Sequence, residues 1–290
     1  MSKKISVVIP AKNEAASLEK LLPRIRAALP DAEIIVVDDG SDDGTSQTAL
    51  DAGATVVRHE YSIGNGGAIK SGARKASGDI LVFLDADGQH PPKHLTDLLG
   101  MYEKGYDMVI GARFTASQST IWRGIANRFY NWLATAITGH KVLDLTSGFR
   151  VVDARLFKQF LFLLPNGFSY PTTITMAFFR AGYQVAYFPF KAEQREGKSH
   201  IKPLKDGLRF LIIIFRIGTL YSPLKMFIPI SAAFFVTGVG YYLYTYMTAG
   251  RFTNMSAMLL TSSVLVFLMG LLSEQVTSLL YTLQQPSSKR

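Results

Sequence analysis

The chain has 290 residues, a formal net charge of +9 and 48% hydrophobic residues, a length that suits one large domain or two small ones. It contains no cysteine, which excludes disulfides and thiolate metal sites and leaves the redox compartment open. The basic excess suits nucleic acid, anionic lipid or a phosphorylated substrate. Because the basic and aromatic run typical of a nucleic-acid groove is missing, we expect no nucleic-acid partner.

The first part of the chain, from Ile5 to about Ala112, alternates short apolar runs with longer mixed segments. This pattern is typical of an α/β fold, in which helices cover both faces of a mostly parallel sheet. We predict strands at Ile5–Pro10, Glu33–Asp38, Thr55–His59, Ile80–Asp85 and Met108–Gly111, and helices at Glu14–Leu29, Thr45–Ala52, Gly67–Ala76 and Lys93–Glu103.

A second, less regular part runs from Arg113 to Glu196. We predict helices at Arg123–Thr138 and Ala154–Leu164, and strands at Phe149–Val152 and Gln184–Phe188. Together the two parts are expected to form one domain over residues 1–200.

Beyond Gly197 the chain becomes more apolar. Residues 201–222 mix four basic side chains with the apolar run Phe210–Phe215, which predicts a helix in the headgroup region of a membrane. An ordinary core helix is the alternative. Met226–Met247 and Phe252–Ser273 carry no charge, and each is about long enough to cross a bilayer. We therefore predict two transmembrane helices, at about 226–247 and 252–274 within residues 223–285, followed by a tail at 286–290.

The distribution of basic residues predicts how these spans are oriented. Four of them precede the first span and two end the chain, whereas the loop between the spans has only Arg251; the six are Lys205, Arg209, Arg216, Lys225, Lys289 and Arg290. The positive-inside rule places both termini in the cytoplasm. Residues 1–4 lead directly into a strand, so we expect no signal peptide. The expected protein is integral to the plasma membrane of a prokaryote or to an ER-type membrane. Gly238 and Gly240 would allow close helix contact in a homo-oligomer.

The fourth predicted strand continues into the sequence I-L-V-F-L-D-A-D-G-Q-H-P-P, residues 80–92. Asp85 and Asp87 stand at the carboxyl end of this strand, where ligands bind in open α/β sheets. With the amide oxygen of Gln89 they provide hard oxygen ligands of the kind that Mg²⁺ or Mn²⁺ prefers. An acidic, solvated turn is the alternative, and the polar motifs that follow other strands favour the metal.

Two further strands end in polar motifs, P-A-K-N-E at residues 10–14 and D-D-G-S-D-D-G-T at residues 38–45. The first leads into a helix whose amino end favours a negative group. An acid of the second can accept hydrogen bonds from a ribose or a base, while Ser41 and Thr45 are good helix caps. The run G-N-G-G-A at residues 64–68 suits either a diphosphate held by backbone amides or a flexible turn. Neither G-x-G-x-x-G nor G-x-x-x-x-G-K-[ST] occurs, which argues against dinucleotide and P-loop sites.

Together with G-A-R at residues 111–113 and T-S-G-F-R at residues 146–150, these motifs resemble, in this order, a family 2 glycosyltransferase with the GT-A fold. Within that family the chain resembles the dolichyl- or polyprenyl-phosphate sugar synthases, the dolichol-phosphate mannose synthase group. The resemblance covers about residues 5–221. It implies an inverting, metal-dependent transfer of one hexose from a nucleotide sugar, of the GDP-mannose or UDP-glucose type, to a polyprenyl or dolichyl phosphate.

The resemblance also implies roles for individual residues. The donor would be bound by Pro10, Ala11, Asn13, Glu14, Val37, Asp39, Asp85, Ala86, Arg195 and Lys198. The divalent ion, Mg²⁺ or Mn²⁺, would be held by Asp85, Asp87 and Gln89. The acceptor phosphate would be bound by Arg113, Arg123 and Asn127, and the catalytic set would be Asp87, Arg113 and Arg123. His200 stands where relatives often have lysine, and Asn127 where some have serine.

The residues themselves leave the acceptor open. A lipid phosphate is already ionised near neutral pH, and arginine binds such a group by forked hydrogen bonds. A hydroxyl acceptor instead needs a general base, for which Asp144 is a candidate. For Arg150 we expect structural pairing with an acid such as Asp144 or Asp153.

Two rival functions remain. One is a membrane-bound transferase acting on a lipid or polysaccharide hydroxyl, although the Q-x-x-R-W motif of processive members is absent. The other is a non-catalytic membrane module that binds nucleotide sugars.

Overall fold

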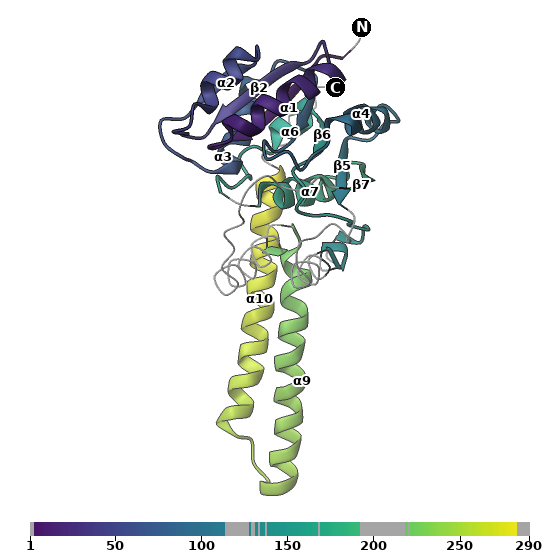
Figure 1. The fold of residues 1–290 in the computed structure, drawn as a ribbon. Coiled ribbons are helices and arrows are strands. Elements are labelled where there is room, and N and C mark those ends of the chain that lie inside the picture. Colours follow the sequence, from purple (N-terminus) through teal and green to yellow (C-terminus); the bar gives the residue numbers. More distant parts are fainter. Residues whose placement is uncertain are drawn as a thin grey trace. The chain divides into compact units, whose positions relative to one another are not determined.

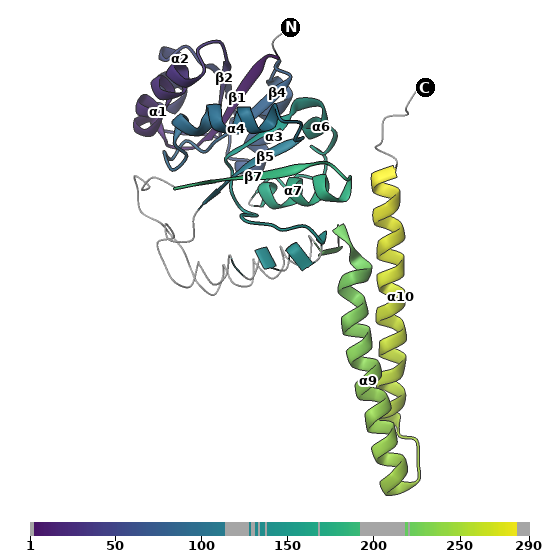
Figure 2. The same ribbon diagram turned by 90° about the vertical axis from the view of Figure 1, so that its right-hand side faces the viewer.

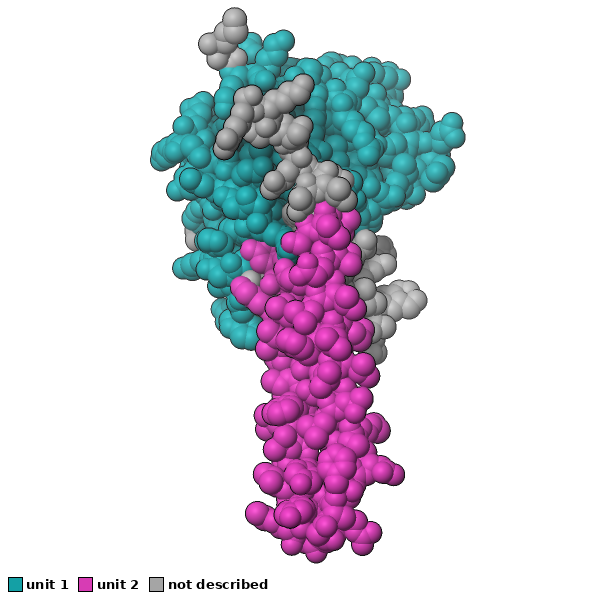
Figure 3. Space-filling view, turned by 180° about the vertical axis from the view of Figure 1, so that it is seen from behind, with its two compact units in different colours: residues 1–201 teal, residues 202–290 magenta. Residues whose placement is uncertain are grey.

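The computed structural model describes residues 3–113, 128, 131–132, 134–136, 138–167, 169–191, 218–219 and 221–282. The chain divides into two compact units, residues 1–201 and 202–290, which are coloured separately in Figure 3. The first unit is built on a seven-stranded sheet, and the second contains two long helices (Figures 1 and 2).

The sheet of the first unit has the order β3-β2-β1-β4-β6-β5-β7. Its strands are β1 (Ile5–Ala11), β2 (Glu33–Asp38), β3 (Thr55–Arg58), β4 (Ile80–Phe83), β5 (Met108–Arg113), β6 (Arg150–Asp153) and β7 (Val185–Phe190). Only β6 is antiparallel to its neighbours β4 and β5. Because β4 and β5 both oppose β6, they run in the same direction. The carboxyl ends of β1, β2, β4 and β5 therefore meet at one edge, which carries the predicted site.

Helices cover both faces of this sheet, as the sequence predicts. They are α1 (Ala15–Ala28), α2 (Thr45–Asp51), α3 (Asn65–Lys75), α4 (Leu95–Tyr102), α6 (Ala154–Gln159) and α7 (Tyr170–Arg180), with the 3₁₀ turn η1 at Pro92–His94. Val7 and Ile9 pack in one core with residues of α1 and α4. On the other face Gly72 of α3 approaches Val8 so closely that an added Cβ would lie 2.3 Å from Val8 Cγ1. Phe83 packs there against Phe157 of α6, with ring centroids 4.7 Å apart.

The helix α7 is the one element of the described chain that the sequence did not predict. Its eleven residues, Y-P-T-T-I-T-M-A-F-F-R, include three threonines and an isoleucine, residues of modest helix propensity. The first ten are all buried. Tyr170, Ile174, Ala177 and Phe178 do recur at helical spacing, but the buried threonines between them form no exposed polar face and lower the helix propensity of the segment.

The other predicted elements occur within a few residues of their expected bounds, with two exceptions. The helix predicted at Ala154–Leu164 ends at Gln159 and continues as turns, and the second transmembrane helix, predicted to end at about residue 274, continues to Thr282. Most of the predicted helix at Arg123–Thr138 lies outside the described residues, and its described residues are helical. Most of the predicted interfacial helix at residues 201–222 also lies outside the described part of the chain.

The second unit consists of α9 (Pro223–Ala249) and α10 (Asn254–Thr282), joined by a short turn. Each has a stretch of 27 residues that is long and apolar enough to cross a membrane. In the most apolar 18-residue stretch of each helix, only 11% of the residues of α9 and 17% of those of α10 are buried. Apolar side chains that stay exposed in this way are not those of a soluble core, in agreement with the predicted membrane hairpin.

Small residues line the contact between these two helices. Ser231 Oγ donates to the carbonyl of Ser263, and Ser263 Oγ to that of Ser231, each over 2.9 Å. A Cβ added to Gly270 would lie 2.7 Å from Phe227 Cβ. Gly238 faces the other helix within the hairpin, whereas nothing lies within 4 Å of a Cβ built on Gly240. Small interface residues of this kind let membrane helices pack closely.

Candidate active site

The ends of β1 and β2 bring together the predicted donor-binding residues of the first two strands. Pro10 pairs with Val37 in the parallel register, and the Asp39 amide donates to the Ala11 carbonyl over 2.9 Å. The neighbouring strand β4 runs parallel to β1 and leads to Asp85. Three adjacent strand ends thus supply a common site.

The turns after β1 and β2 are tied to each other. The Asn13 amide donates to Ser41 Oγ over 2.9 Å, and Asn13 Oδ1 accepts from the Asp42 amide over 3.0 Å. Asn13 has φ +55°, a left-handed conformation that asparagine tolerates. Asp43 Oδ2 accepts from the Ala15 amide over 3.1 Å and so caps the first turn of α1 from a neighbouring loop. These contacts give the two motifs a structural role beside the predicted one.

Glu14 lies just before α1. Its amide donates to Thr45 Oγ1 over 3.0 Å, and its carboxylate accepts from Ser17 Oγ over 2.7 Å. The Glu14 side chain therefore caps no backbone amide of the helix, so an acid that caps the helix start from this position is not observed.

Asp39 is 4% exposed and is surrounded by hydrogen-bond donors. Its carboxylate lies 2.8 Å from His59 Nδ1 and accepts from Ser62 Oγ over 2.7 Å and from the amides of Ile63 and Gly64 over 2.8 Å. Burial alone would raise the pKa of Asp39, but the hydrogen bonds from His59, Ser62 and the two amides lower it to about 2. The structure thus shows Asp39 organising the loop before α3.

The glycines that open α3 do not cradle a diphosphate. The Gly66 amide donates to the Gly167 carbonyl over 3.2 Å, and the Gly67 amide to the Asn166 carbonyl over 2.7 Å. A Cβ added to Gly66 would lie 2.0 Å from the Pro165 carbonyl oxygen. The diphosphate interpretation of G-N-G-G-A is therefore wrong for these two amides, because a distant loop already occupies them. The glycines permit this close approach of backbone to backbone.

The acids after β4 have a different environment. The Asp85 side chain is 33% exposed, and a Cβ added to Gly148 would lie 2.9 Å from Asp85 Oδ2. Asp87 Oδ1 accepts from the Gln89 amide over 3.2 Å, which closes the bend. Glycine at position 148 leaves space for the Asp85 carboxylate beside the T-S-G-F-R segment.

His90 fixes the backbone beneath these acids. Its Nδ1 accepts from the Asp85 amide over 3.0 Å, and its ring stacks on Phe149 with centroids 5.2 Å apart. Burial lowers the pKa of His90 to about 4. The ring is therefore neutral at physiological pH, in the tautomer that leaves Nδ1 as an acceptor. Sequence reasoning assigned no role to His90.

Arg113, at the end of β5, is engaged by Asp144. Arg113 Nε lies 2.8 Å from Asp144 Oδ2 and Nη2 lies 3.1 Å from Oδ1, a bidentate pair, and Nη2 also donates to Thr146 Oγ1 over 2.7 Å. Burial alone would raise the pKa of Asp144, but the hydrogen bonds and the charge of Arg113 lower it. The charges of Asp85 and Asp87 also act on Arg113. The predicted metal-binding acids and Arg113, which was predicted to bind the acceptor phosphate, therefore lie within electrostatic reach of each other.

Among the described residues, Arg150 pairs with no acid, contrary to expectation. It is fully buried, and Nη1 donates to the Pro171 carbonyl over 3.2 Å and to Thr175 Oγ1 over 3.3 Å. Its guanidinium carbon lies 5.8 Å from the centre of the Tyr170 ring. The arginine thus holds the start of α7 through a carbonyl, a hydroxyl and a cation–π contact.

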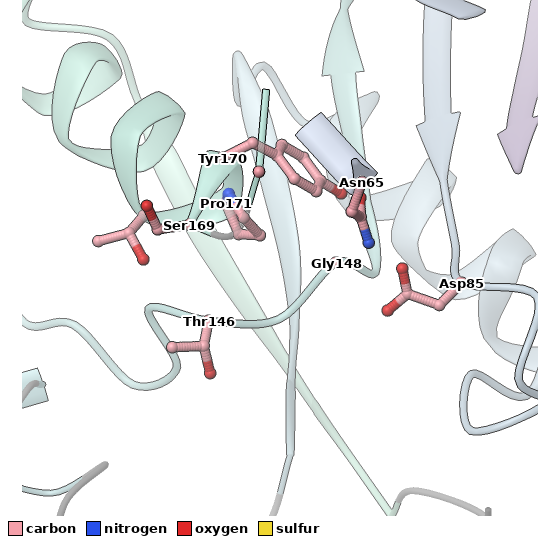
Figure 4. A pocket seen from close by; sticks show the side chains of 9 residues that line it. Asn65, Asp85, Thr146, Gly148, Ser169, Tyr170 and Pro171 are labelled. Carbon is pink, nitrogen blue, oxygen red and sulfur yellow. The ribbon is translucent and has the colours of Figure 1, made fainter. Parts of the chain in front are cut away.

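A pocket of about 90 Å³ opens beside Asp85. Figure 4 shows Asp85 facing Asn65 of α3, with Tyr170 and Pro171 of α7 above and Thr146 on the opposite strand connection. Apart from Asp85, the polar side chains that line it are hydroxyls and an amide. Sequence reasoning missed Asn65, Thr146 and Tyr170. The T-S-G-F-R motif, with Gly148 inside it, was the only signal for this side of the site.

Asp85 and Asp87 fit a divalent cation. They supply hard carboxylate oxygens at the ligand-binding edge of the sheet, and Asp85 reaches into the pocket. Within the described residues no group of three or more acidic, histidine or cysteine side chains could hold a metal. Mg²⁺ is commonly bound by one or two carboxylates together with substrate phosphates, so two acids suit an ion that the donor diphosphate completes. The predicted residues Arg123, Asn127, Arg195 and Lys198 lie outside the described part of the chain.

The chain belongs to glycosyl transferase family 2, whose family model matches residues 6–163. A second model, the GtrB C-terminal hairpin, matches residues 222–279. The family 2 model thus covers the strands β1 to β6 but not β7, and the hairpin model covers α9 and most of α10.

Two relatives are undecaprenyl-phosphate 4-deoxy-4-formamido-L-arabinose transferases. The protein of Photorhabdus laumondii is 37% identical over 152 residues, which cover 49% of this chain and 46% of the relative. That of Yersinia pestis is 35% identical over 190 residues, covering 59% of this chain and 58% of the relative. The chain therefore spans about half the length of the curated relatives it matches.

A similar solved structure is glucosyl-3-phosphoglycerate synthase from Mycobacterium tuberculosis in complex with Mn²⁺ and UDP-glucose. It matches with a TM-score of 0.61 and 24% identity, over 75% of this chain and 78% of that chain. This likeness shows the fold, which is the predicted GT-A fold.

Proposed function

We propose that this protein transfers one hexose from a nucleotide sugar, with inversion, to the phosphate of a polyprenyl or dolichyl lipid at the cytoplasmic face of a membrane. The donor would be of the GDP-mannose or UDP-glucose type. Three features support the proposal: the family 2 domain, the hairpin that matches the GtrB C-terminal family, and relatives whose names specify undecaprenyl phosphate as acceptor.

The observation that carries the choice of acceptor is the bidentate pair of Arg113 and Asp144. A hydroxyl acceptor needs a general base whose pKa lies near the working pH. Asp144 is buried, hydrogen-bonded through both oxygens and lowered in pKa, so it is poorly suited to accept a proton. In the described pocket the other polar groups are neutral, apart from Asp85, which the proposal gives to the metal. A phosphate acceptor needs no base because its oxygen is already ionised.

The reaction balances without a proton transfer. An oxygen of the lipid phosphate attacks the anomeric carbon, the bond from that carbon to the donor phosphate breaks, and the nucleoside diphosphate leaves. A single displacement of this kind inverts the anomeric centre. A divalent ion held by Asp85, Asp87 and Gln89 would stabilise the charge of the leaving diphosphate. Mg²⁺ and Mn²⁺ both suit these ligands.

Arg113 has two tasks in this proposal. Its pairing with Asp144 fixes the guanidinium, and its 23% exposed side chain remains available at the edge that Asp85 shares. There it would draw the acceptor phosphate toward the donor, together with Arg123 and Asn127, by charge and by hydrogen bonds. Arg195 and Lys198 would bind the donor from the segment beyond β7.

The nucleotide would lie over the ends of β1 and β2, against Pro10, Ala11 and Val37. Asn13, Glu14 and Asp39 would then shape the pocket mainly by holding its loops, because they hydrogen-bond to neighbouring loops and to the first turn of α1. Ala86, which is 2% exposed, would serve as the buried spacer between Asp85 and Asp87.

The membrane elements follow from such a lipid. A polyprenyl tail stays in the bilayer, so its phosphate is available only at the headgroup plane, and anchoring the enzyme raises the local concentration of acceptor. The basic residues that flank the two spans support a cytoplasmic location for both termini and, in this proposal, for the catalytic domain.

The test is a product assay with the purified full chain, Mn²⁺ or Mg²⁺, a polyprenyl phosphate and a panel of nucleotide sugars. We expect a lipid whose mass equals the polyprenyl phosphate plus one hexose, formed from one donor of the panel. The absence of any lipid-linked sugar across the panel, with donor binding intact, would favour the non-catalytic module and overturn the proposal.

A further inference from the structure

One residue that lines the pocket has a buried hydroxyl without a hydrogen-bond partner in the described part of the chain. Among the described residues, the buried side-chain polar atoms without a hydrogen bond are Tyr170 Oη, Tyr187 Oη and Arg150 Nε. Leaving such a group without a hydrogen bond costs roughly 1–3 kcal/mol, so each of these three atoms needs an explanation. Of the two tyrosines, only Tyr170 lines the pocket beside Asp85.

The position of Tyr170 is closely fixed. It is the first residue of α7 and is 2% exposed, and its ring packs against Phe83 and over the guanidinium of Arg150. Burial raises its pKa above the usual value, so the hydroxyl stays neutral and can both donate and accept. In Figure 4 its hydroxyl end points toward Asn65, whose exposed side chain bounds the pocket on that side.

The other polar groups that line the pocket can pair with the edge of a sugar ring. The Asn65 amide can donate and accept, and Asp85 supplies an acceptor. The hydroxyls of Thr146 and Thr172 already donate to Asp144 and to the Leu145 carbonyl, so they can only accept. A sugar hydroxyl both donates and accepts. At about 90 Å³ the pocket is smaller than the roughly 300–1,000 Å³ of a site for a whole small molecule. It therefore suits one edge of a ring and not a nucleotide.

We propose that this pocket receives the hydroxyl-bearing edge of the transferred hexose, and that Tyr170 Oη hydrogen-bonds one of its hydroxyls and so helps to select the sugar. The inference rests on the proposed donor, a nucleotide sugar, but not on the acceptor. Asn65, which lies at the exposed start of α3, would turn to admit the sugar to the tyrosine. The substrate would then supply the hydrogen bond that Tyr170 Oη lacks among the described residues.

The first experiment compares donor binding in the full-length protein and in Tyr170→Phe. Calorimetry with Mn²⁺ measures the dissociation constants of UDP-glucose, GDP-mannose, UDP and GDP. We expect Tyr170→Phe to weaken the sugar nucleotide that binds by about tenfold, and to leave the matching nucleoside diphosphate unchanged. Equal effects on the sugar nucleotide and on the diphosphate, or no effect on either, would overturn the inference.

Tyr187→Phe is the matched control. Tyr187 Oη is also buried and unpartnered, but it lies on β7 and does not line the pocket. We expect this variant to bind sugar nucleotide and diphosphate as the parent does. Because neither substitution removes a hydrogen bond within the protein, both variants should melt at or above the temperature of the parent. If Tyr187→Phe weakened the sugar nucleotide as much as Tyr170→Phe, the effect would be structural and the inference wrong.

A second experiment identifies the hydroxyl. The donor that binds is replaced by its monodeoxy analogues, each lacking one sugar hydroxyl, and each is measured with both proteins. In the parent, the analogue lacking the hydroxyl bound by Tyr170 should lose about tenfold in affinity. In Tyr170→Phe that one penalty should vanish while the others persist. A purely structural role of Tyr170 would leave all position-specific penalties the same, and that result would overturn the inference.

These outcomes separate the inference from the proposed function. If the sugar nucleotide shows the expected dependence on Tyr170 but no sugar reaches a lipid phosphate, the acceptor is wrong and the pocket stands. If sugar is transferred to lipid phosphate with no dependence of donor binding on Tyr170, the function stands and the pocket assignment falls.

Discussion

Two acidic loops lie at the same edge of the sheet but have different roles. The loop after β2, residues 38–45, uses its acids on the protein itself: Asp39 holds the segment before α3, and Asp43 caps α1. The loop after β4 presents Asp85, 33% exposed, to a pocket. Both loops look alike in sequence, since each is a short acidic stretch with glycine after a buried strand.

The comparison shows that the role of an acid at a strand end depends on the hydrogen-bond donors that later segments of the chain bring to its carboxylate. Asp39 receives two backbone amides and two side chains from residues 59–64, so its charge is already satisfied. Asp85 instead adjoins a glycine of the T-S-G-F-R segment, which leaves room beside the carboxylate. We therefore expect substitutions in the β2 loop to affect folding, and substitutions in the β4 loop to affect chemistry.

The largest effect should come from Asp87→Ala. Loss of one of two carboxylates at the proposed metal site should lower kcat by at least about 100-fold, because the charge of the leaving diphosphate loses its counterion. The melting temperature should change little. Steady-state kinetics over a range of Mn²⁺ concentrations measures the effect, with the exposed Asp31→Ala as control. Full turnover in Asp87→Ala would remove the metal role and erase the contrast between the two loops.

Gly66→Ala tests the close packing at the start of α3, the helix whose preceding segment is held by the β2 loop. The added Cβ would collide with the Pro165 carbonyl oxygen, 2.0 Å away, and overpacking of this kind should destabilise the first unit by about 3 kcal/mol. The control is Gly100→Ala in α4, where nothing lies within 4 Å of the new Cβ and a gain of about 1 kcal/mol is expected from helix propensity. Thermal unfolding of both variants and the parent measures these stability changes. Equal stability in the two would show that the loop at residues 165–167 yields easily.

Asp39→Asn should lower the free energy of unfolding by about 2 kcal/mol at pH 7. The new amide nitrogen faces groups that donate hydrogen bonds, so at least one of them loses its acceptor. Because the folded pKa of Asp39 lies at about 2, below its ordinary value, its stabilisation is present above about pH 4 and is lost as pH falls toward 2. The stability difference between parent and variant should therefore shrink over that range. A difference that does not depend on pH would contradict the assigned hydrogen bonds.

Asp43→Ala should have the smallest effect, about 1 kcal/mol, since it removes a side-chain cap from the first turn of α1. Asp43→Asn keeps an oxygen acceptor and should recover part of the loss. Hydrogen exchange at the Ala15 amide gives a local reading. Unchanged exchange there in Asp43→Ala would show that the cap contributes nothing.

Much of the fold could be predicted because local signals agree with it. The buried runs of β1, β2 and β4 are short and apolar and lie between helical segments, so strand, order along the chain and ligand-binding edge all followed from the sequence. The acids of the site were also found in this way, since strand ends mark the edge directly.

The remainder depends on contacts between distant segments. Nothing local shows that Pro165–Gly167 will lie on Gly66, or that the charge of Arg150 will be met by the Pro171 carbonyl and not by an acid. Asn65 and Tyr170 are 105 residues apart in the sequence and meet only through the packing of α3 and α7 around the sheet. Pocket residues of that kind follow from the three-dimensional arrangement and have no motif of their own.

The most direct test of the account is a comparison of two acceptors that differ by one group. The purified chain is given its nucleotide sugar, Mn²⁺ and either a polyprenyl phosphate or the corresponding polyprenol, and the lipid products are weighed by mass spectrometry. We predict one hexose on the phosphate and none on the alcohol. Glycosylation of the alcohol, with the phosphate unused, would contradict the account.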